Sequence, residues 1–335
     1  MPVDVSPIFV IGCTRSGKSL VAAILNKHPD LYITFESQIY SSLYRKWTYR
    51  LREGVSDPHA VFKELILNRD SDLKIGKEEL DRCLEESGPS WESMYNEYMR
   101  LVISKNRPGA TRWGDKTPVD AGTTGIIHRH YPNVQFVYLY RDPRDTVSSM
   151  SLPSYSPCVN NHLINADVYD QYLREYSKEI YRDDLNILHV RYESLVANPA
   201  GEVGRICNFL NLDFRPQLLK PASESIRKPI GWEGFSFWDD IKVQPVEESC
   251  YDPYVEAYLT RWIDEMEYQE NPVNFRQLKR IATTLYLLPF KITRRLLKFF
   301  FQRKYPKFPY ICYSFPRAGS LKRWLTPGKT NGSKK

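Results

Sequence analysis

Residues 7 to 12 form a short, nearly continuous apolar run, Pro-Ile-Phe-Val-Ile-Gly. A run of this length without polar alternation is typical of a parallel strand that is buried on both faces. From Ser19 to Lys27 the apolar positions follow the period of a helix instead, and His28-Pro29 ends that period. The pattern therefore predicts a strand, a polar loop and a helix in direct succession.

Two later apolar runs predict further strands of the same sheet. They cover residues 134 to 140 (VQFVYLY) and 185 to 191 (LNILHVR), each preceded by a helical pattern and followed by polar or turn residues. Strands that alternate with helices predict an α/β fold with mainly parallel strands. We therefore expect a P-loop-like sheet flanked by helices, in one domain over residues 1 to 272.

The segments between the predicted strands are mostly helical in pattern. Residues 40 to 105 are rich in charged and aromatic residues at helical spacing, with breaks at Gly54 and Gly76, which predicts a helical insertion that shapes a substrate pocket. Residues 254 to 268 return to helical spacing. Residues 221 to 246 lack periodicity, and we expect an ordered loop there.

The positive charge of the chain is concentrated at one end. Residues 273 to 335 contain 16 Lys or Arg and no Asp or Glu, so residues 1 to 272 carry 31 basic and 40 acidic side chains. Residues 285 to 301 interleave apolar residues with cations, a basic amphipathic pattern suited to an anionic membrane surface or an acidic partner. The alternative is a helix packed on the body with its basic face in water. We predict a basic C-terminal extension over 273 to 328 and a disordered end over 329 to 335.

The composition of the chain limits the classes of protein to which it can belong. With 42% hydrophobic and 13% aromatic residues, the 335 positions provide a sizeable core. The six cysteines are scattered without a C-x-x-C pair, which predicts neither a zinc site nor a dense disulfide framework. No signal peptide is visible, and no apolar stretch reaches the roughly 20 residues of a membrane span, so we expect a cytoplasmic protein, soluble or peripheral at a membrane. The acidic body and the absence of a recognition motif argue against nucleic-acid binding.

The loop at residues 12 to 19 (GCTRSGKS) satisfies the Walker A pattern G-x-x-x-x-G-K-[ST]. The backbone N–H groups of such a loop, and the N-terminus of the helix after it, favour an anion. Arg15, Lys18 and Ser19 add charged or hydroxyl donors. The loop therefore predicts a phosphate-type ligand, and it leaves open whether that ligand is a nucleoside triphosphate.

A second anion-binding group is predicted at residues 140 to 149 (YRDPRDTVSS). A predicted strand ends at Arg141, and Asp142 is suited to cap the helix that follows. Arg141 and a hydroxyl on that helix, Ser149, can close on one phosphate. Two alternatives stay open: a surface ion pair between Arg141 and Asp142, or Asp142 as the magnesium-binding aspartate of a nucleoside triphosphatase.

Taken together, the motifs of this chain resemble the sulfotransferase family, and more narrowly its branch with tyrosylprotein sulfotransferases and many bacterial sulfotransferases. They occur in the order of the family and cover roughly residues 7 to 215. In chain order they are Ile8 to Gly17, His28-Pro29-Asp30, Arg112 to Pro118, Arg141 to Ser149, and Arg191 to Leu195 with Pro199.

The resemblance implies transfer of a sulfuryl group from 3′-phosphoadenosine 5′-phosphosulfate (PAPS) to a hydroxyl or amine. Arg141 and Ser149 match the residues that hold the 3′-phosphate, and Tyr192 resembles a tyrosine that contacts the cofactor. The 5′-phosphosulfate side is matched by Arg15, Ser16, Gly17, Lys18 and Ser19. The chain departs from this branch at positions 18 and 19, where two threonines are usual; Lys18 resembles the loop lysine of cytosolic sulfotransferases. Because a sulfuryl group in transfer carries less negative charge than a phosphoryl group, lysine and arginine donors are expected to suffice, and no metal ligand is predicted.

The resemblance also implies which residues move protons and stabilise charge. Glu36, at the expected end of a strand after the first helix, matches the catalytic glutamate of the tyrosylprotein branch and would take the proton of the acceptor; the alternative is a helix cap or ion pair. His28 and His130 are weaker candidates for the base. Lys116 corresponds to a family lysine that meets the transferring group, with a surface lysine as the alternative.

We therefore predict a PAPS-dependent sulfotransferase that acts by in-line displacement and releases adenosine 3′,5′-bisphosphate. Arg227 and Lys228 lie where the family closes over the cofactor, although a solvated pair is an equal alternative. Two other functions stay open: a P-loop kinase or nucleoside triphosphatase that uses Mg-ATP, and a non-catalytic sulfotransferase-like protein tethered to a membrane by its tail. Carbohydrate, lipid, peptide tyrosine and small-molecule acceptors are all compatible with the pattern, and the oligomeric state is not visible in it.

Overall fold

The computed structural model describes most of the chain up to residue 220 and one later helix. The described ranges are 4–35, 37–68, 75–117, 123–151, 161–180, 183–220 and 253–266, with five further positions, 284, 285, 288, 289 and 292. The described residues fall into two compact units, one within Met1–Asp142 and Gln171–Glu247 and the other within Pro143–Asp170 and Glu248–Lys335. The predicted domain boundary at residue 272 lies outside the described ranges and stays a prediction.

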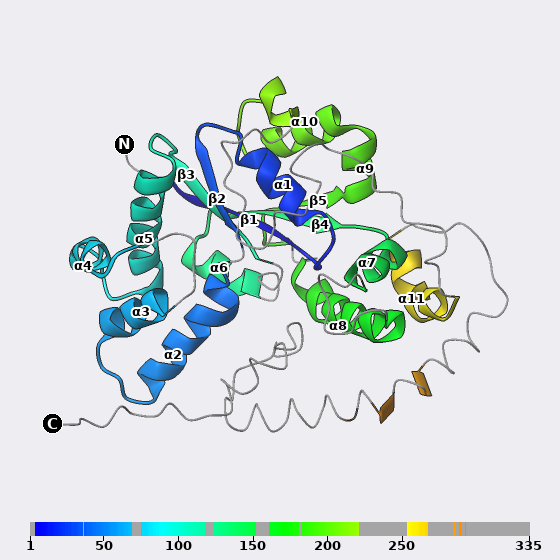
Figure 1. Ribbon diagram of the computed structural model, residues 1–335, viewed down its shortest axis with the longest axis horizontal. Coiled ribbons are helices and arrows are strands. Elements are labelled where there is room, and N and C mark those ends of the chain that lie inside the picture. The colour runs from blue at the N-terminus through cyan, green and yellow to red at the C-terminus, as the bar shows by residue number, and fades with distance from the viewer. Residues whose placement is uncertain are drawn as a thin grey trace. The chain divides into compact units, whose positions relative to one another are not determined.

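The first unit contains a five-stranded sheet in the order β2-β3-β1-β4-β5, and every pair in it is parallel (Figure 1). The strands are β1 (Asp4–Gly12), β2 (Leu31–Phe35), β3 (Arg112–Lys116), β4 (Gln135–Tyr140) and β5 (Ile187–Arg191). The prediction of a mainly parallel α/β sheet is thus confirmed. The three apolar runs of the sequence correspond to β1, β4 and β5, whereas β3 was not predicted.

Helices flank this sheet (Figure 1). Those of the first unit are α1 (Lys18–Leu25), α2 (Tyr44–Arg52), α3 (Pro58–Leu67), α4 (Lys77–Glu85), α5 (Trp91–Asn106), α6 (Thr124–His130), α9 (Tyr192–Ala197) and α10 (Pro199–Phe209). A π-helical turn, Ile39–Leu43, precedes α2, and a short 3-10 helix, Pro216–Leu219, follows α10.

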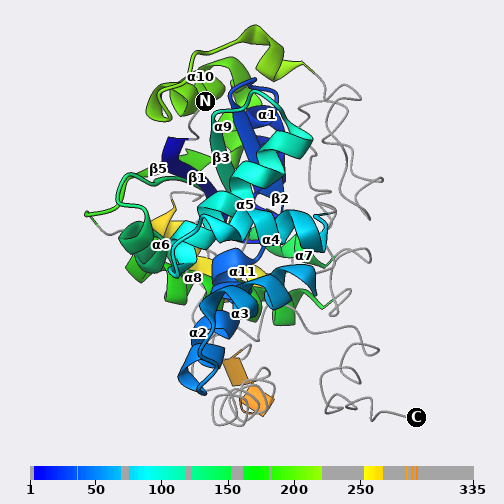
Figure 2. The same cartoon turned by 90° about the vertical axis from the view of Figure 1, so that its left-hand side faces the viewer.

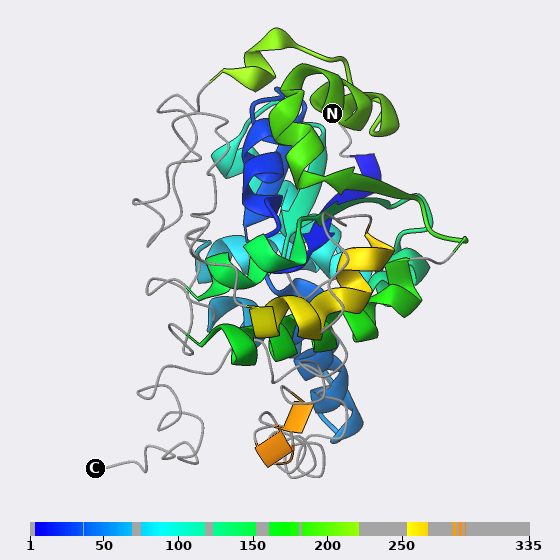
Figure 3. The ribbon, with the colours of Figure 1, turned by 90° about the vertical axis from the view of Figure 1, so that its right-hand side faces the viewer.

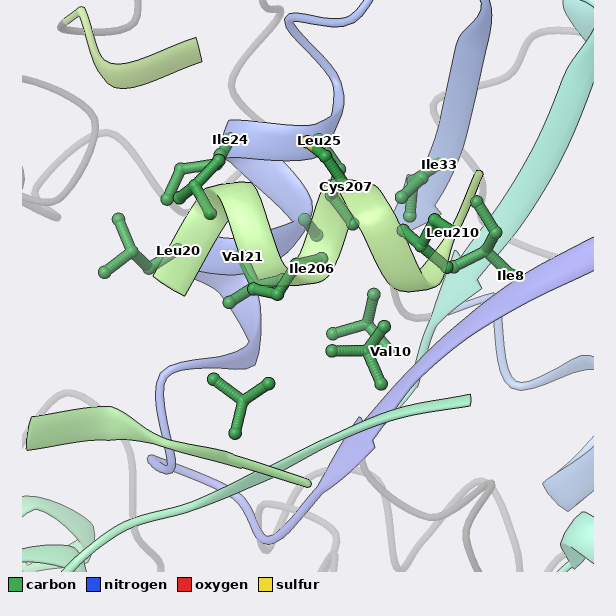
Figure 4. Close-up of a cluster of buried hydrophobic side chains, with 14 of the residues drawn as sticks. Ile8, Val10, Leu20, Val21, Ile24, Leu25, Ile33, Ile206, Cys207 and Leu210 are labelled. Atoms are coloured by element: carbon green, nitrogen blue, oxygen red, sulfur yellow. The ribbon is translucent and has the colours of Figure 1, made fainter. Parts of the chain in front are cut away.

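The strands are buried on both faces because alternate side chains enter two different cores. Ile8 and Val10 join α1 and α10 in an aliphatic cluster (Figure 4). Phe9 points into an aromatic cluster, where its ring centroid lies 6.0 Å from that of Trp113 and 6.1 Å from that of Tyr40. Two packed faces explain why β1 is a continuous apolar run rather than an alternating one.

The helices α2 to α5 occupy the region in which the sequence predicted a helical insertion (Figure 2). Their starts follow simple capping chemistry: Asp57 accepts hydrogen bonds from the backbone N–H groups of His59 and Ala60, with Pro58 as the first helical residue. Ser90 caps α5 in the same way, through the N–H of Ser93. Their predicted role in shaping a substrate pocket stays a prediction.

The second unit contains α7 (Pro143–Met150), the first part of α8 (His162–Ile180) and α11 (Pro253–Glu265). In Figure 3, α11 is the yellow helix. Tyr258 Oη donates to Asp167 Oδ1 at 2.8 Å, and Trp262 Nε1 donates to Asp170 Oδ1 at 2.9 Å. These bonds join α11 to α8. None of the helices among the described residues is both long enough and apolar enough to cross a membrane.

Candidate functional site

The loop between β1 and α1 owes its shape to two glycines with positive φ. At Gly12 (φ +143°) an added Cβ would overlap the carbonyl oxygen of Leu139, so β4 passes too close for any side chain. Gly17 (φ +98°) is the N-cap of α1 and directs the backbone into that helix. The loop is closed by Ser16, whose N–H and Oγ both donate to the carbonyl of Cys13, at 3.3 and 2.8 Å.

Lys18 brings a buried cation to this loop. It is the first residue of α1, and its Nζ donates to the carbonyl of Cys13. The ammonium therefore folds back over the loop, where the positive end of α1 also lies. Burial raises the pKa of the Cys13 thiol to about 12, so this cysteine is a neutral packing residue and not a nucleophile.

Tyr192 connects the loop to the end of β4. An added Cβ at Gly17 would lie 2.5 Å from Tyr192 Cδ2, which means that the tyrosine ring packs directly on the loop. The guanidinium carbon of Arg141 lies 4.5 Å from the centroid of the same ring, a stacking geometry that arginine favours. Three residues that the sequence assigned to the cofactor, Gly17, Arg141 and Tyr192, are thus brought together.

The end of β4 is buried rather than exposed. Arg141 and Asp142 are only 8% and 7% exposed, which excludes the alternative of a surface ion pair. The backbone N–H of Asp142 donates to Glu193 Oε1 at 3.0 Å, so the start of α9 holds the turn after β4. Sequence reasoning did not identify Glu193, although it lies in the Arg-Tyr-Glu-Ser-Leu motif noted for Tyr192.

A second buried group lies at the ends of β2 and β3. Lys116 is 1% exposed, which excludes the alternative of a surface lysine, and its Nζ lies 5.1 Å from the centroid of the Phe35 ring. Beside it, Asp115 accepts hydrogen bonds from Thr34 Oγ1 at 2.5 Å and from Thr117 Oγ1 at 2.7 Å. The sequence analysis did not predict this hydrogen-bond network. The Asp-Lys-Thr motif, residues 115 to 117, is the feature of the sequence that points to it.

Several predicted site residues are not placed by these observations. Glu36, Arg227 and Lys228 lie outside the described residues, and their roles stay predictions. Ser149 lies on α7, in the second unit. Its contact to the same phosphate as Arg141 also stays a prediction.

Both histidines that the sequence offered as weaker candidates for the base are hydrogen-bonded within the fold. His28 is buried just before β2, at the amino end of the strand, and its Nδ1 accepts from the backbone N–H of Asp30 at 3.3 Å. His130 Nδ1 lies 3.0 Å from Tyr40 Oη. Burial lowers the pKa of both rings.

Two of the cavities among the described residues of the first unit lie near opposite ends of its strands. The larger, about 480 Å³, is lined by residues at the amino ends of strands, including Arg112 and Gln135. The smaller, about 180 Å³, is lined by Ser37, Gln38 and Lys46 among others, just after the end of β2. Ligands of open α/β sheets bind at the carboxyl ends of the strands, so the smaller cavity is the better candidate for an acceptor.

The fold and the site define a class of protein. A parallel α/β sheet carries a glycine-dependent loop before a helix N-terminus, and buried cations gather at the carboxyl ends of its strands. The model of the sulfotransferase family matches residues 7–216. The chain therefore belongs to the sulfotransferase family.

Individual relatives refine this assignment. The chain is 26% identical over 290 residues to a protein-tyrosine sulfotransferase of Drosophila melanogaster; the match covers 74% of this chain and 52% of the relative, so the chain spans about half of its length. A putative protein-tyrosine sulfotransferase of Caenorhabditis briggsae is 25% identical over 215 residues, 63% of this chain and 68% of the relative. Among solved structures, a sulfotransferase domain of the curacin biosynthetic pathway aligns with a TM-score of 0.50 at 20% identity, over 81% of this chain and 99% of that domain, which supports the fold.

Proposed function

We propose that this protein transfers a sulfuryl group from PAPS to a hydroxyl or amine acceptor. The observation that carries the proposal is the packing of Tyr192 on Gly17 together with the stacking of Arg141 on the Tyr192 ring. This packing joins the two regions that the family resemblance assigns to opposite ends of one cofactor. The match to the family model supports the same assignment.

The residues of the loop fit the 5′-phosphosulfate end of PAPS. The loop leads into the N-terminus of α1 and carries the buried Lys18 ammonium. A helix N-terminus beside a cation suits a doubly charged anion. Arg15 and Ser19 are the further donors that we assign there. Arg141, with its forked guanidinium at the end of β4, suits the 3′-phosphate.

PAPS, when bound, supplies the electrophilic sulfuryl group and the leaving phosphate. In the mechanism that we propose, Lys18 and Lys116 stabilise negative charge on the oxygens around the reacting sulfur. Arg15 and Arg141 orient the donor so that the acceptor attacks in line. Glu36 takes the proton of the acceptor as the new bond forms.

Peptide tyrosine is the first acceptor to test, because the relatives reported above carry protein-tyrosine sulfotransferase in their names. Carbohydrate, lipid and small-molecule hydroxyls are the other classes.

We further propose that the basic extension, residues 273 to 328, brings the protein to an anionic membrane surface. That extension lies almost entirely outside the described residues.

Calorimetry with adenosine 3′,5′-bisphosphate tests the cofactor assignment. We expect the wild type to bind it and Arg141→Ala to bind at least about tenfold more weakly, since a charge-assisted hydrogen bond contributes roughly 1.5–3 kcal/mol. Arg100→Ala is the matched control, because Arg100 forms an exposed ion pair with Glu97 on α5. Absence of binding to the wild type, or equal affinities of wild type and Arg141→Ala, would refute the assignment.

Transfer of label from ³⁵S-PAPS to the four acceptor classes then identifies the acceptor.

A further inference from the structure

Asp115 is a fully buried carboxylate at the end of β3, with both oxygens occupied. Oδ1 accepts from Thr34 Oγ1 at 2.5 Å, and Oδ2 accepts from Thr117 Oγ1 at 2.7 Å. A buried carboxylate is costly unless its oxygens accept hydrogen bonds, and here two hydroxyl groups meet that need. The hydroxyl of Thr117 in turn accepts from the backbone N–H of Gln38 at 3.1 Å.

These bonds tie down both ends of the segment that leaves β2. Thr34 is the partner of Asp115 in the β2–β3 ladder, and Phe35 is the partner of Lys116. One end of the segment is therefore held at Thr34, directly by Oδ1. The other end is held at Gln38, through Thr117 and Oδ2. A single carboxylate thus holds both Thr34 and Gln38.

The segment held in this way borders the proposed site. Lys116 follows Asp115 directly, and its Nζ lies over the ring of Phe35. Ser37 and Gln38 line the cavity of about 180 Å³. Gln38 has a positive φ of 51° and precedes the π-helical turn, a conformation that persists where the surroundings impose it.

We infer that Asp115 is a positioning residue for sulfuryl transfer, which holds Lys116, Thr34 and Gln38 in the arrangement that the reaction needs. The inference rests on the proposed function. Asp115 does not contact the acceptor, because it is fully buried and both its oxygens already accept hydrogen bonds from threonines. Its effect passes through Thr34, Thr117 and the backbone of Gln38.

Asp115→Asn and Asp115→Ala separate positioning from acid–base chemistry. An asparagine has the same shape and keeps both links, since its oxygen accepts from one threonine and its amide donates to the hydroxyl oxygen of the other. We expect Asp115→Asn to retain kcat within about threefold and Asp115→Ala to lose about 100-fold, the order of loss that a displacement of about 1 Å causes. Both rates are divided by the number of sites that bind adenosine 3′,5′-bisphosphate, so that loss of folded protein does not count as loss of rate.

Thr117→Val and Thr117→Ser provide a second pair for the case in which Asp115→Ala does not fold. Valine removes the Thr117 hydroxyl, and with it both the acceptor of the Gln38 N–H and the donor to Asp115 Oδ2, whereas the bond between Thr34 and Asp115 remains; serine keeps all of these bonds. We expect Thr117→Val to lower kcat about tenfold with unchanged affinity for the bisphosphate, and to speed hydrogen exchange of the Gln38 amide, whereas Thr117→Ser behaves like the wild type.

The outcomes of these measurements are distinct. If Asp115→Asn loses as much activity as Asp115→Ala, then Asp115 acts through its charge, and the inference that it is a positioning residue is wrong. If Thr117→Val exchanges Gln38 faster but keeps its kcat, the network is only structural and the inference also fails. A wild type that neither binds the bisphosphate nor transfers label from ³⁵S-PAPS refutes the proposed function itself, before any variant is compared.

Discussion

The loop between β1 and α1 and the ends of β2 and β3 both carry a buried lysine, yet they are built in different ways. The loop depends on backbone geometry, with Gly12 and Gly17 at positive φ and a helix N-terminus beside them. The β2–β3 end depends on side chains, with a carboxylate that joins Thr34 to a residue 83 positions later in the chain, Thr117. The loop is thus encoded locally, whereas the β2–β3 end exists only once the sheet has formed.

This difference suggests a division of tasks between the two regions. The loop and the stacked pair of Arg141 and Tyr192 form the part that suits the donor of the sulfuryl group. The β2–β3 end, with Lys116 and the adjacent cavity, forms the part that suits the acceptor. Damage to the first region should therefore appear as lost affinity for the nucleotide. Damage to the second should appear as lost rate at normal affinity.

The largest effect is expected from Gly17→Ala, which breaks the loop. The added Cβ lies 2.5 Å from Tyr192 Cδ2 and the residue keeps a φ of +98°, so the loop must move or the ring must leave it. We expect calorimetry to show affinity for adenosine 3′,5′-bisphosphate reduced by at least about 100-fold, because both the strain of positive φ and the overlap act on the binding loop.

Gly109→Ala is the control for this change. Gly109 has a φ of +105°, but an added Cβ there meets no atom within 4 Å. It should lower the free energy of unfolding by about 1–2 kcal/mol and leave the affinity unchanged. Equal affinities of Gly17→Ala and Gly109→Ala would show that the loop is not the nucleotide site.

An intermediate effect is expected from Lys116→Met, which tests the β2–β3 end. Methionine retains the apolar stem beside Phe35 and removes the ammonium. We expect kcat to fall about 100-fold, as for loss of one preorganised donor, with affinity for the bisphosphate within about threefold of the wild type. Lys105→Met, at an exposed ion pair with Glu79, is the control. A drop in affinity without a drop in kcat would reverse the division of tasks.

The smallest effect is expected from pH, through a residue remote from both regions. Burial lowers the pKa of His28 in the folded state below its ordinary value of 6.5. Below pH 6.5 the unfolded state therefore binds more protons than the folded state. The stability that neutral His28 contributes is fully present above pH 6.5 and is lost as the pH falls from there towards the folded-state pKa.

Thermal unfolding between pH 8 and pH 5 measures this loss. His28→Asn keeps an acceptor for the Asp30 N–H and should show a shallower decline of the melting temperature as the pH is lowered. Affinity for the bisphosphate, measured at pH 8, should not change, since His28 lies at the amino end of β2. An identical decline in wild type and variant would mean that His28 does not contribute.

The sheet illustrates how far sequence patterns reach. Three of its strands follow from apolar runs, and the fold class follows from their alternation with helices. The strand β3 was not predicted because its sequence is Arg-Trp-Gly-Asp-Lys, which contains a single large apolar residue. All five of its residues are nevertheless buried.

Burial of the charges in β3 is possible because other parts of the chain supply partners. Arg112 donates to the backbone carbonyls of Ser6 and Leu210 and to Gln135 Oε1. Asp115 is satisfied by two threonines. These partners lie far away in the chain, so the sequence around β3 does not indicate them. A strand with charged residues therefore resembles a polar loop in the sequence.

By itself the sequence determined the strand, loop and helix of residues 7 to 27, because apolar spacing, glycine and a helix start act over a few neighbouring residues. The anion-binding character of the loop stays a prediction. The tertiary structure alone decided that Lys116 and Asp115 are buried and that Tyr192 lies on the loop. These facts depend on residues far apart in the chain that meet only when parallel strands pair. The motif at residues 112 to 118 thus pointed to a site, and only the folded sheet showed which of its residues are held by hydrogen bonds and which side chains they place.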